Sequence, residues 1–461
     1  MFNNKNGPNE AITRKTLLPA TLLALLLGGC STDGSDDGET GYVQLYNASA
    51  NAPTLYPTID DNQHSGAAFG RAVSRLEYDT GSYDFSLSWT AADDTQVDFY
   101  DESLKINNNQ VSFIAVAGDF ASPQTLVYQF AVEDPDEDFS FRFFNLSNQQ
   151  DLDLYISEGH ESFADAELVG SYSYLAMSES HLVELGNYRF YLTAAGNQEV
   201  LFESGDIGFT YTSQYKLIAR ANTGPGQSSL VLDLVSNSSG ATALDDINAS
   251  TRLQIYHGIP EAPSTDLHLG QVDDSPELTQ VAPHSLSGEL LLAPGDFSLQ
   301  LVQAEGNALI SQNHLVTLNP NDDRTVFFYT DIEIDEETDE QTREISTIIV
   351  DNATNDGLYE HHIDVVNLVQ AYDYLNVYFV RGNETIDTAA YKLSSIGNES
   401  EAITLPNGDY QVLVTTSGNS NRLLLASTVL ALDEDQPNQF LVVEDGDQEG
   451  SFTLTRVTQT P

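Results

Sequence analysis

Cysteine, tryptophan and basic residues are scarce in this 461-residue chain. There is one cysteine, Cys30, so the chain cannot form a disulfide within itself. There is one tryptophan, Trp89. Lysine and arginine together number 17 against 70 aspartates and glutamates, which gives a formal net charge of −53 at pH 7. Because phosphate binding needs clustered basic side chains, this balance argues against nucleic acid as a partner.

Catalytic signatures are also missing. The sequence contains no H-E-x-x-H, no G-x-S-x-G and no glycine-rich phosphate loop. Among 70 acidic residues, carboxylate pairs arise by chance, so a pair alone does not indicate acid–base chemistry. We therefore do not expect an enzyme. The carboxylates are explained by hydration in salty water, which suggests a salt-tolerant source; dedicated cation binding is the alternative.

The N-terminus has the pattern of an export signal. Arg14 and Lys15 precede an apolar run, residues 17–27, that is too short to span a bilayer as a helix. The sequence Leu27-Gly28-Gly29-Cys30 at the end of this run resembles a bacterial lipobox. The resemblance implies that signal peptidase II cleaves between Gly29 and Cys30, that residues 1–29 are a signal peptide, and that Cys30 becomes acylated. An accidental cysteine after an ordinary signal peptide is the alternative.

Residues 30–40 follow as a tether. After the cysteine they read S-T-D-G-S-D-D-G-E-T, without an apolar residue, so they cannot bury enough surface to offset their ordering entropy. By resemblance to the enteric sorting rule, Ser31 permits transfer to the outer membrane. We therefore expect a lipid-anchored protein of the outer membrane of a Gram-negative bacterium, on its periplasmic or its surface face. The covalent lipid makes the membrane a partner.

Four copies of one unit fill the rest of the chain, at 41–134, 139–236, 251–350 and 361–457. Each copy opens with an alternating strand that ends on asparagine or histidine: Asn47, Asn145, His257 and Asn367. Each copy later has a glycine, one variable residue and an aromatic that begins another alternating strand: Gly81 and Tyr83, Gly186 and Tyr188, Gly295 and Phe297, Gly408 and Tyr410. We expect these glycines to supply a turn conformation that other residues adopt at a cost.

Strand-like alternation and frequent turn residues over about 100 residues per copy predict an all-β chain of small antiparallel sandwiches. Each sheet is expected to bury one face and expose the other. Polar joints separate the copies at 134–138, 236–250 and 351–360. We therefore expect four self-sufficient domains, arranged as beads on a string, in a monomer.

The third copy resembles a known family. Residues 255–270 read I-Y-H-G-I-P-E-A-P-S-T-D-L-H-L-G, and residues 294–299 read P-G-D-F-S-L. Both stretches are similar to a bacterial envelope family known as domain of unknown function 4397. Residues 47–53 of copy one have a decayed version, so we expect the best match at 251–350. The resemblance implies Ig-like or transthyretin-like sandwiches on secreted or lipid-anchored proteins, and it implies no reaction.

His257, Asp266 and His268 form the most metal-like constellation. His257 ends one strand, Asp266 and His268 share a face of the next, and adjacent antiparallel strands can bring such residues within ligand distance. The alternative is that His257 caps its strand through hydrogen bonds, because the other copies have asparagine at this place.

Residues 445–450 imitate the first half of an EF-hand loop, with Asp445, Asp447 and Glu449 at alternate positions. The twelfth position, which requires glutamate, is Arg456, so the segment fails as an EF-hand. A loose calcium site in a turn is the remaining possibility.

Two functions follow from these observations. The first is a non-catalytic structural or adhesion-like interaction role in the envelope, with an unidentified envelope protein or glycan as partner. The second is a ligand-binding module for extracellular glycan or peptide, with calcium as a possible aid. Trp89 is the natural residue for stacking on a sugar, although a lone tryptophan in a sandwich is more often core.

Overall fold

The computed structural model describes residues 39–147, 150–237, 240–272, 275–334, 341–355, 357–416, 423–434, 436–446 and 450–459. The predicted signal peptide and nearly all of the predicted tether therefore lie outside the described residues. No helix in the described ranges is both long and apolar enough to cross a membrane.

The described chain consists of β-strands and one turn of 3-10 helix, which follow one another as four sandwiches. Sandwich 1 comprises β1 (Thr40–Asn47), β2 (Tyr56–Ile59), β3 (Asn62–Gln63), β4 (Leu76–Asp79), β5 (Gly81–Thr90), β6 (Gln96–Ile106), β7 (Gln110–Ala117) and β8 (Gln124–Ala131). Sandwich 2 comprises β9 (Asp138–Asn145), β10 (Leu152–Glu158), η1 (Phe163–Asp165), β11 (Glu167–Tyr172), β12 (His181–Glu184), β13 (Gly186–Ala194), β14 (Val200–Glu203), β15 (Ile207–Phe209), β16 (Gln214–Ala221), β17 (Leu230–Val235) and β18 (Ala241–Leu244).

The last two sandwiches repeat the plan of the first. Sandwich 3 comprises β19 (Thr251–Gly258), β20 (Thr265–Leu269), β21 (Leu278–Val281), β22 (Leu290–Leu292), β23 (Gly295–Gln303), β24 (Leu309–Leu318), β25 (Asp323–Ile334) and β26 (Gln341–Asp351). Sandwich 4 comprises β27 (Glu360–Asn367), β28 (Leu375–Val380), β29 (Tyr391–Ile396), β30 (Ser400–Pro406), β31 (Gly408–Thr416), β32 (Leu424–Leu432), β33 (Gln439–Asp445) and β34 (Phe452–Thr458).

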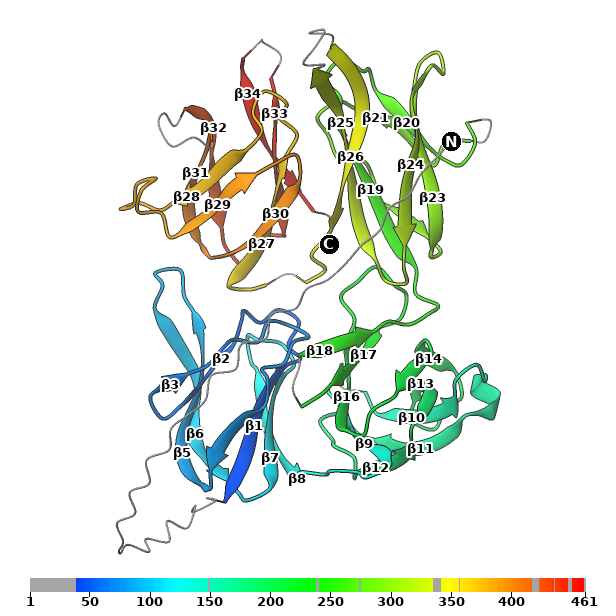
Figure 1. The fold of residues 1–461 in the computed structure, drawn as a ribbon, viewed down its shortest axis with the longest axis vertical. Coiled ribbons are helices and arrows are strands. Elements are labelled where there is room, and N and C mark those ends of the chain that lie inside the picture. Colours follow the sequence, from blue (N-terminus) through cyan, green and yellow to red (C-terminus); the bar gives the residue numbers. More distant parts are fainter. Residues whose placement is uncertain are drawn as a thin grey trace, which may run out of the picture. The chain divides into compact units, whose positions relative to one another are not determined.

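Every sandwich has the same two sheets (Figure 1). The A sheet contains the first strand of the sandwich, in the order β4-β1-β7-β8, β12-β9-β16-β17-β18, β22-β19-β25-β26 or β30-β27-β33-β34. The B sheet contains the second strand, in the order β3-β2-β5-β6, β11-β10-β13-β14, β21-β20-β23-β24 or β29-β28-β31-β32; β15 also pairs with β13. The predicted all-β sandwich class is therefore confirmed.

The A sheets depart from the prediction in one ladder. The first strand pairs in parallel with the penultimate long strand of its sandwich: β1 with β7, β9 with β16, β19 with β25, and β27 with β33. The other ladders are antiparallel, as in the pairing of β1 with β4. Alternation along a strand shows which face is buried, but it does not show whether the neighbouring strand runs parallel or antiparallel. The parallel ladder could therefore not be predicted from the alternation.

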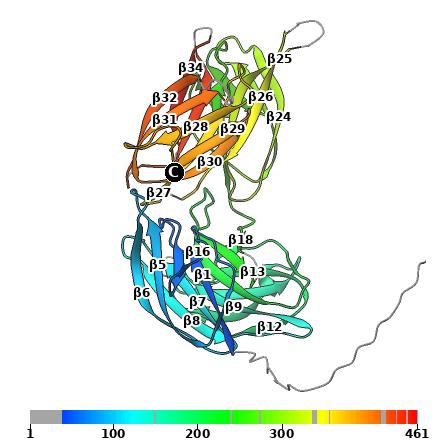
Figure 2. The same cartoon turned by 60° about the vertical axis from the view of Figure 1, so that its left-hand side comes forward.

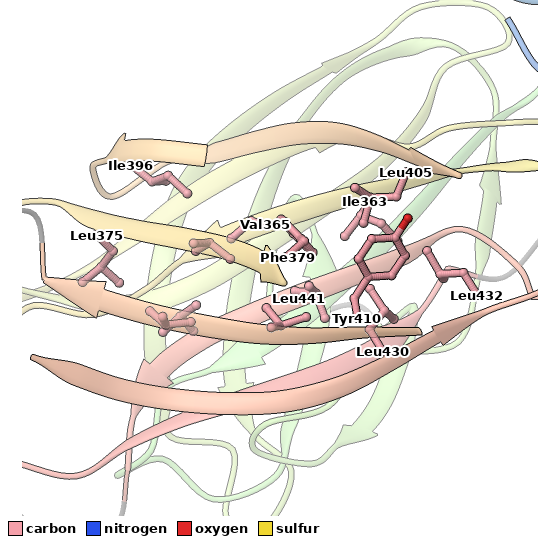
Figure 3. Packing of buried hydrophobic residues seen from close by; sticks show 14 of the residues in the cluster. Ile363, Val365, Leu375, Phe379, Ile396, Leu405, Tyr410, Leu430, Leu432 and Leu441 are labelled. Atoms are coloured by element: carbon pink, nitrogen blue, oxygen red, sulfur yellow. The ribbon is translucent and has the colours of Figure 1, made fainter. Parts of the chain in front are cut away.

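Each sandwich has its own apolar core between the two sheets. In sandwich 4, Val365 of the A sheet meets Phe379 and Val412 of the B sheet, and Tyr410 lies within the same cluster (Figure 3). Strand β31 shows why: from Tyr410 to Val414 its residues are alternately buried and less buried, which is the pattern of a sheet with one face on a core.

The central A-sheet strands are buried on both faces. Strand β7, Q-V-S-F-I-A-V-A, is buried at every residue after the first, and β19 is buried throughout. The second face of each A sheet packs on the A sheet of a neighbouring sandwich. Phe113 of sandwich 1 lies 4.9 Å from Phe144 of sandwich 2, and Phe327 of sandwich 3 lies 5.1 Å from Phe440 of sandwich 4, between ring centroids.

The expectation of beads on a string is therefore wrong. Two apolar clusters are shared, one by sandwiches 1 and 2 and one by sandwiches 3 and 4, and residues 39–461 form one compact unit (Figures 1 and 2). The predicted joint at 236–250 contains β18, whose Ala241 is buried in the first shared cluster. Apolar side chains on both faces of strands such as β7 make this contact favourable.

Candidate functional site

The polar residue that ends each first strand has the same environment in all four sandwiches. Asn47, Asn145 and His257 are 0% exposed and Asn367 is 1% exposed. Each side chain accepts a hydrogen bond from the backbone N–H two residues further on, at 3.0, 3.2, 3.3 and 3.0 Å in chain order. The side chain therefore closes a turn at the end of its strand. We call these four the capping residues.

The donor side of each capping asparagine reaches a second segment of the chain. The three asparagine amides donate to backbone carbonyls that precede the edge strand of the A sheet, namely those of Ala67, Tyr172 and Gly397. A buried amide with both ends paired stabilises the backbone that it bridges, and its truncation leaves buried groups unpaired.

His257 also uses both polar ends of its side chain, but its donor bond stays within the loop that follows β19, as the bond of Asn47 to the Pro53 carbonyl at 3.4 Å stays within the loop that follows β1. Nδ1 accepts from the N–H of Ile259, and Nε2 lies 3.0 Å from the carbonyl oxygen of Pro263, to which it donates. This arrangement requires the neutral ring, and burial lowers the pKa of His257, which favours the same form. Histidine thus occupies the place of the asparagine in the other sandwiches, in agreement with the capping interpretation.

The structure does not bring together the predicted metal ligands. His257 lies on β19 in an A sheet, whereas Asp266 and His268 lie on β20 in the B sheet of the same sandwich. The Asp266 carboxylate accepts instead from the N–H of Gln280 at 2.8 Å. Over the described ranges, no three His, Cys, Asp or Glu side chains are placed to hold a metal ion. The prediction that two adjacent strands of one sheet hold these residues is wrong.

The other predicted site residues are only partly described. Asp447 and Glu449 of the predicted calcium loop lie outside the described residues, as do Gly29 and Cys30. Asp445 ends β33 and accepts from the N–H of Gln370 at 3.4 Å. Burial raises the pKa of the Asp445 carboxyl.

Trp89 lies near the end of β5 with one face of its indole already covered. Its ring stacks on Tyr359, with centroids 4.2 Å apart and planes inclined by 20°. A sugar cannot stack on that face while Tyr359 is in place.

Only one of the four glycines in the glycine–aromatic motif, Gly408, has a positive φ (157°), and the motif has a further role besides the predicted one. The Tyr188 hydroxyl donates to the carbonyl of Glu184, four residues earlier, and Tyr83 and Tyr410 make the same bond in their sandwiches. A Cβ on Gly186 would lie 3.2 Å from the Tyr188 ring, so glycine leaves space for the ring; its φ is not in the left-handed region. The arrangement resembles the tyrosine corner of Ig-like sandwiches. In sandwich 3 the residue is Phe297, which has no hydroxyl.

A buried polar network joins the A sheets of sandwiches 1 and 2. The Tyr46 hydroxyl donates to the Asp233 carboxylate, and the Arg220 Nε donates to the same carboxylate at 2.7 Å. The Arg220 guanidinium also lies 4.6 Å from the centre of the Phe69 ring. Sequence reasoning missed this network; the signal was a charged residue inside the apolar run L-I-A-R-A, residues 217–221.

Lys216 is the second buried cation of this contact and is 0% exposed. Its Nζ donates to Gln44 Oε1 at 2.8 Å and to Asn237 Oδ1 at 2.7 Å. Burial, with a smaller contribution from Arg75, lowers the pKa of Lys216 to about 7.

Sandwiches 3 and 4 have a corresponding contact. The Tyr256 hydroxyl donates to Glu444 Oε1 at 3.0 Å, and His284 Nδ1 lies 2.9 Å from Glu444 Oε2. Tyr46 and Tyr256 both directly precede a capping residue, so the two pairs of sandwiches use the same tyrosine position for this contact.

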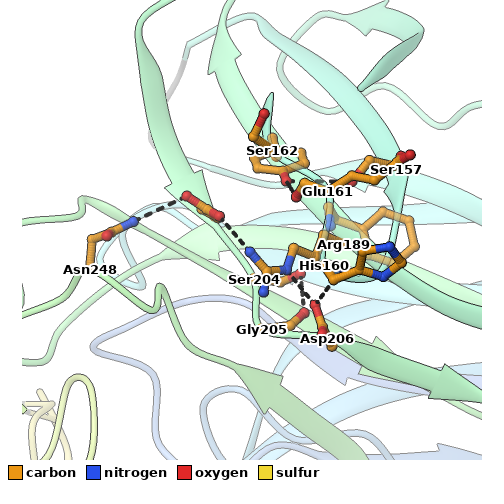
Figure 4. Close-up of polar contacts among 12 residues, drawn as sticks. Ser157, His160, Glu161, Ser162, Arg189, Ser204, Gly205, Asp206 and Asn248 are labelled. Atoms are coloured by element: carbon orange, nitrogen blue, oxygen red, sulfur yellow. Dashed lines mark hydrogen bonds and ion pairs between the residues drawn. The ribbon is translucent and has the colours of Figure 1, made fainter. Parts of the chain in front are cut away.

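A hollow of about 500 Å³ on sandwich 2 has an acidic lining that includes Glu158, Glu161 and Asp165. Beside it, Arg189 pairs with Asp206 and Glu203, as Figure 4 shows. Asp206 and Glu203 are thus paired within the chain, whereas Glu158 and Asp165 of the lining are exposed, which is typical of a hydrated surface.

Comparisons with known proteins give the following results. No curated protein matches this chain in sequence. Among solved structures, the TIE protein of Bacillus anthracis is 9% identical with a TM-score of 0.16, over 88% of this chain and 68% of that one. BcpA, the major pilin subunit of Bacillus cereus, is 9% identical with a TM-score of 0.16, over 68% of this chain and 100% of that one. Likenesses this weak support no inference about function.

A family match covers sandwich 1 and the start of sandwich 2 and confirms the predicted resemblance, although the motif at 255–270 predicts the best match in the third sandwich. It extends from β1 of sandwich 1 into β10 of sandwich 2. Residues 41–155 match the family described as Domain of unknown function (DUF4397).

Proposed function

We propose that this chain is a lipid-anchored protein of the bacterial outer membrane or cell surface with a non-catalytic structural or interaction role in the envelope. The observation that supports this proposal most directly is the use of the recurring polar residues. The four capping residues have their donors and acceptors engaged with the chain's own backbone. The recurrence of these residues is therefore explained by folding, without a reaction.

The proposed anchor is supported by the sequence that ends in Cys30. The apolar run, the Leu27-Gly28-Gly29-Cys30 motif and the apolar-free tether have the order expected of a lipoprotein. Attachment through two or three acyl chains is long-lived, so the sandwiches remain at the membrane surface. The partner in the envelope is a protein or a glycan, and a net charge of −53 disfavours nucleic acid.

Replacement of the cysteine tests the anchor. Cells producing the wild type or Cys30→Ser are labelled with radioactive palmitate and separated into membrane and soluble fractions, with Ser35→Ala as a control in the tether. We expect label and membrane retention in the wild type and in Ser35→Ala, and neither in Cys30→Ser. Retention of unlabelled Cys30→Ser would overturn the anchor.

Activity of the purified chain tests the non-catalytic role. A hydrolytic activity that is lost in Asp266→Asn while the fold is kept would overturn the proposal, because Asp266 has no part in the capping of any strand. We expect no such activity.

A further inference from the structure

The segment before β27 lies on sandwich 1, far from its place in the sequence. The N–H of Leu358 donates to the carbonyl of Asn51 at 3.0 Å. Tyr359 stacks on Trp89, and Phe120 contacts the same tyrosine ring edge-on at 6.0 Å between centroids. Leu358 and Tyr359 both pack against the apolar core of sandwich 1.

The next residue adds a polar contact. Glu360 Oε2 accepts hydrogen bonds from the backbone N–H and from the hydroxyl of Thr54, both at 2.9 Å. Burial raises the pKa of the Glu360 carboxyl, although both Thr54 bonds favour its ionised form. The N–H of Leu358 thus meets the carbonyl of Asn51, and the Tyr359 ring meets two aromatic side chains. The Glu360 carboxylate meets the two donors of Thr54. These are the elements with which proteins recognise extended peptides.

Sandwich 4 holds the segment in position. Asn407 donates from its side chain to the Leu358 carbonyl and from its backbone N–H to the Tyr359 carbonyl, both at 3.1 Å. The peptide that sandwich 1 receives is therefore preorganised, which lowers the entropy cost of the contact.

A second contact joins the same two sandwiches. The Arg381 guanidinium donates to both carboxylate oxygens of Asp94, at 2.9 and 2.6 Å, and the Tyr391 hydroxyl lies 3.2 Å from Asp94. Asp94 is about half exposed, so this ion pair orients the contact more than it stabilises it.

The contact is less tightly packed than a core. A cavity of about 140 Å³ remains next to Glu360, bounded by Thr54 and Phe69 of sandwich 1 and by His362 and Thr404 of sandwich 4. The centres of the shared A-sheet contacts are apolar clusters whose buried residues are at most 8% exposed. A polar contact with residual space is typical of a surface that can open and close.

We infer that the end of sandwich 1 formed by Asn51, Thr54, Trp89 and Phe120 is a binding site for an extended peptide with an aromatic residue followed by an acidic one. Residues 358–360 occupy this site in cis and so close sandwich 4 onto sandwich 1. The inference concerns the folded chain and does not depend on the lipid anchor.

The fluorescence of Trp89, the single tryptophan, reports on the site directly. In purified Tyr359→Ala we expect emission to shift to longer wavelength and the acrylamide quenching constant to rise about two-fold or more, because the indole loses its cover. Tyr359→Phe keeps the ring and should behave as the wild type. Tyr374→Ala, at a tyrosine of sandwich 4 that is 54% exposed, should leave Trp89 unchanged. Wild-type emission and quenching in folded Tyr359→Ala, with folding checked by circular dichroism, would overturn the inference.

A synthetic peptide of residues 357–362 tests recognition itself. Added to Tyr359→Ala, it should restore wild-type emission and quenching with saturation, whereas the same peptide with alanine for tyrosine should not. The additional variant Thr54→Val, which lacks the hydroxyl donor, should weaken the binding several-fold and leaves the aromatic wall intact. No change in Trp89 emission at peptide concentrations of about 1 mM, the effective concentration of a tethered segment, would overturn the proposed site.

Discussion

The hydroxyl of Tyr46 donates a hydrogen bond to the carboxylate of Asp233 across the contact between sandwiches 1 and 2. Both residues are fully buried, and the same carboxylate accepts from Arg220. One carboxylate thus satisfies a phenol and a guanidinium that come from two sandwiches. The contact between these sandwiches therefore depends on paired buried charge as well as on aromatic packing.

Removal of Asp233 should destabilise this contact strongly. Asp233→Ala leaves the Arg220 charge buried without its carboxylate, so we expect a loss of about 3–5 kcal/mol in the free energy of unfolding. Tyr46→Phe removes one hydrogen bond to a charged group and should cost about 1.5–3 kcal/mol. Urea unfolding followed by circular dichroism measures both.

The exposed pair of Arg324 and Asp351 is the control for these variants. Asp351 is 79% exposed, so Asp351→Ala should change the free energy of unfolding by less than about 1 kcal/mol. Equal losses in Asp233→Ala and Asp351→Ala would contradict the role of the buried network.

Sandwich 3 offers a stabilising substitution. Phe297 stands where the other sandwiches have a tyrosine whose hydroxyl donates to the carbonyl four residues earlier. Phe297→Tyr should add this bond to the carbonyl of Ala293 and raise the stability by about 0.5–1.5 kcal/mol. The reverse change, Tyr188→Phe, should lower it by a similar amount. Thermal unfolding of both variants measures these changes in stability. A destabilised Phe297→Tyr would show that the turn before Phe297 in sandwich 3 differs from the corresponding turns of the other sandwiches.

Lys216 makes the stability depend on pH above neutrality. Its pKa is about 7 in the folded chain against an ordinary 10.5, so between these values the unfolded chain binds more protons. Stability therefore rises with pH in this window, by at most about 1.4 kcal/mol per pH unit, and the rise is absent below pH 7 where both states are protonated. Urea unfolding at pH 7, 8 and 9 measures the slope.

Two lysine variants separate this effect from that of the other groups. Lys216→Met should flatten the slope, whereas Lys105→Met, at an exposed lysine, should keep it. An unchanged slope in Lys216→Met would contradict the assignment to this side chain.

Local patterns in the sequence predicted the sandwiches but not how they combine. The alternation that ends on Asn145 placed β9 correctly, because alternation and turn residues are properties of adjacent positions. The parallel partner of β1, strand β7, begins more than sixty residues later, and nothing in either strand specifies the direction of pairing. Burial of β7 on both faces was readable from V-S-F-I-A-V-A, which has little of the polar alternation of an exposed sheet.

At the candidate site, too, local features could be predicted from the sequence, whereas contacts between distant residues could not. The asparagines at the positions equivalent to His257 correctly suggested a strand cap, because the sandwiches can be compared within one sequence. The cover of Trp89 could not be predicted, since Tyr359 lies 270 positions further along the chain and the contact exists only once sandwich 4 has folded. The predicted metal triad failed because residues close in sequence, His257 and Asp266, belong to different sheets.

We propose that the recurring polar residues hold the fold and do not bind a metal or a substrate. Thermal unfolding of the wild type, His257→Asn and His257→Ala, each with and without EDTA, tests it most directly. We expect His257→Asn to melt within about 2 °C of the wild type, His257→Ala to melt about 4 °C or more lower, and EDTA to have no effect. A wild-type melting temperature that EDTA lowers, and that no longer responds to EDTA in His257→Asn, would contradict the claim.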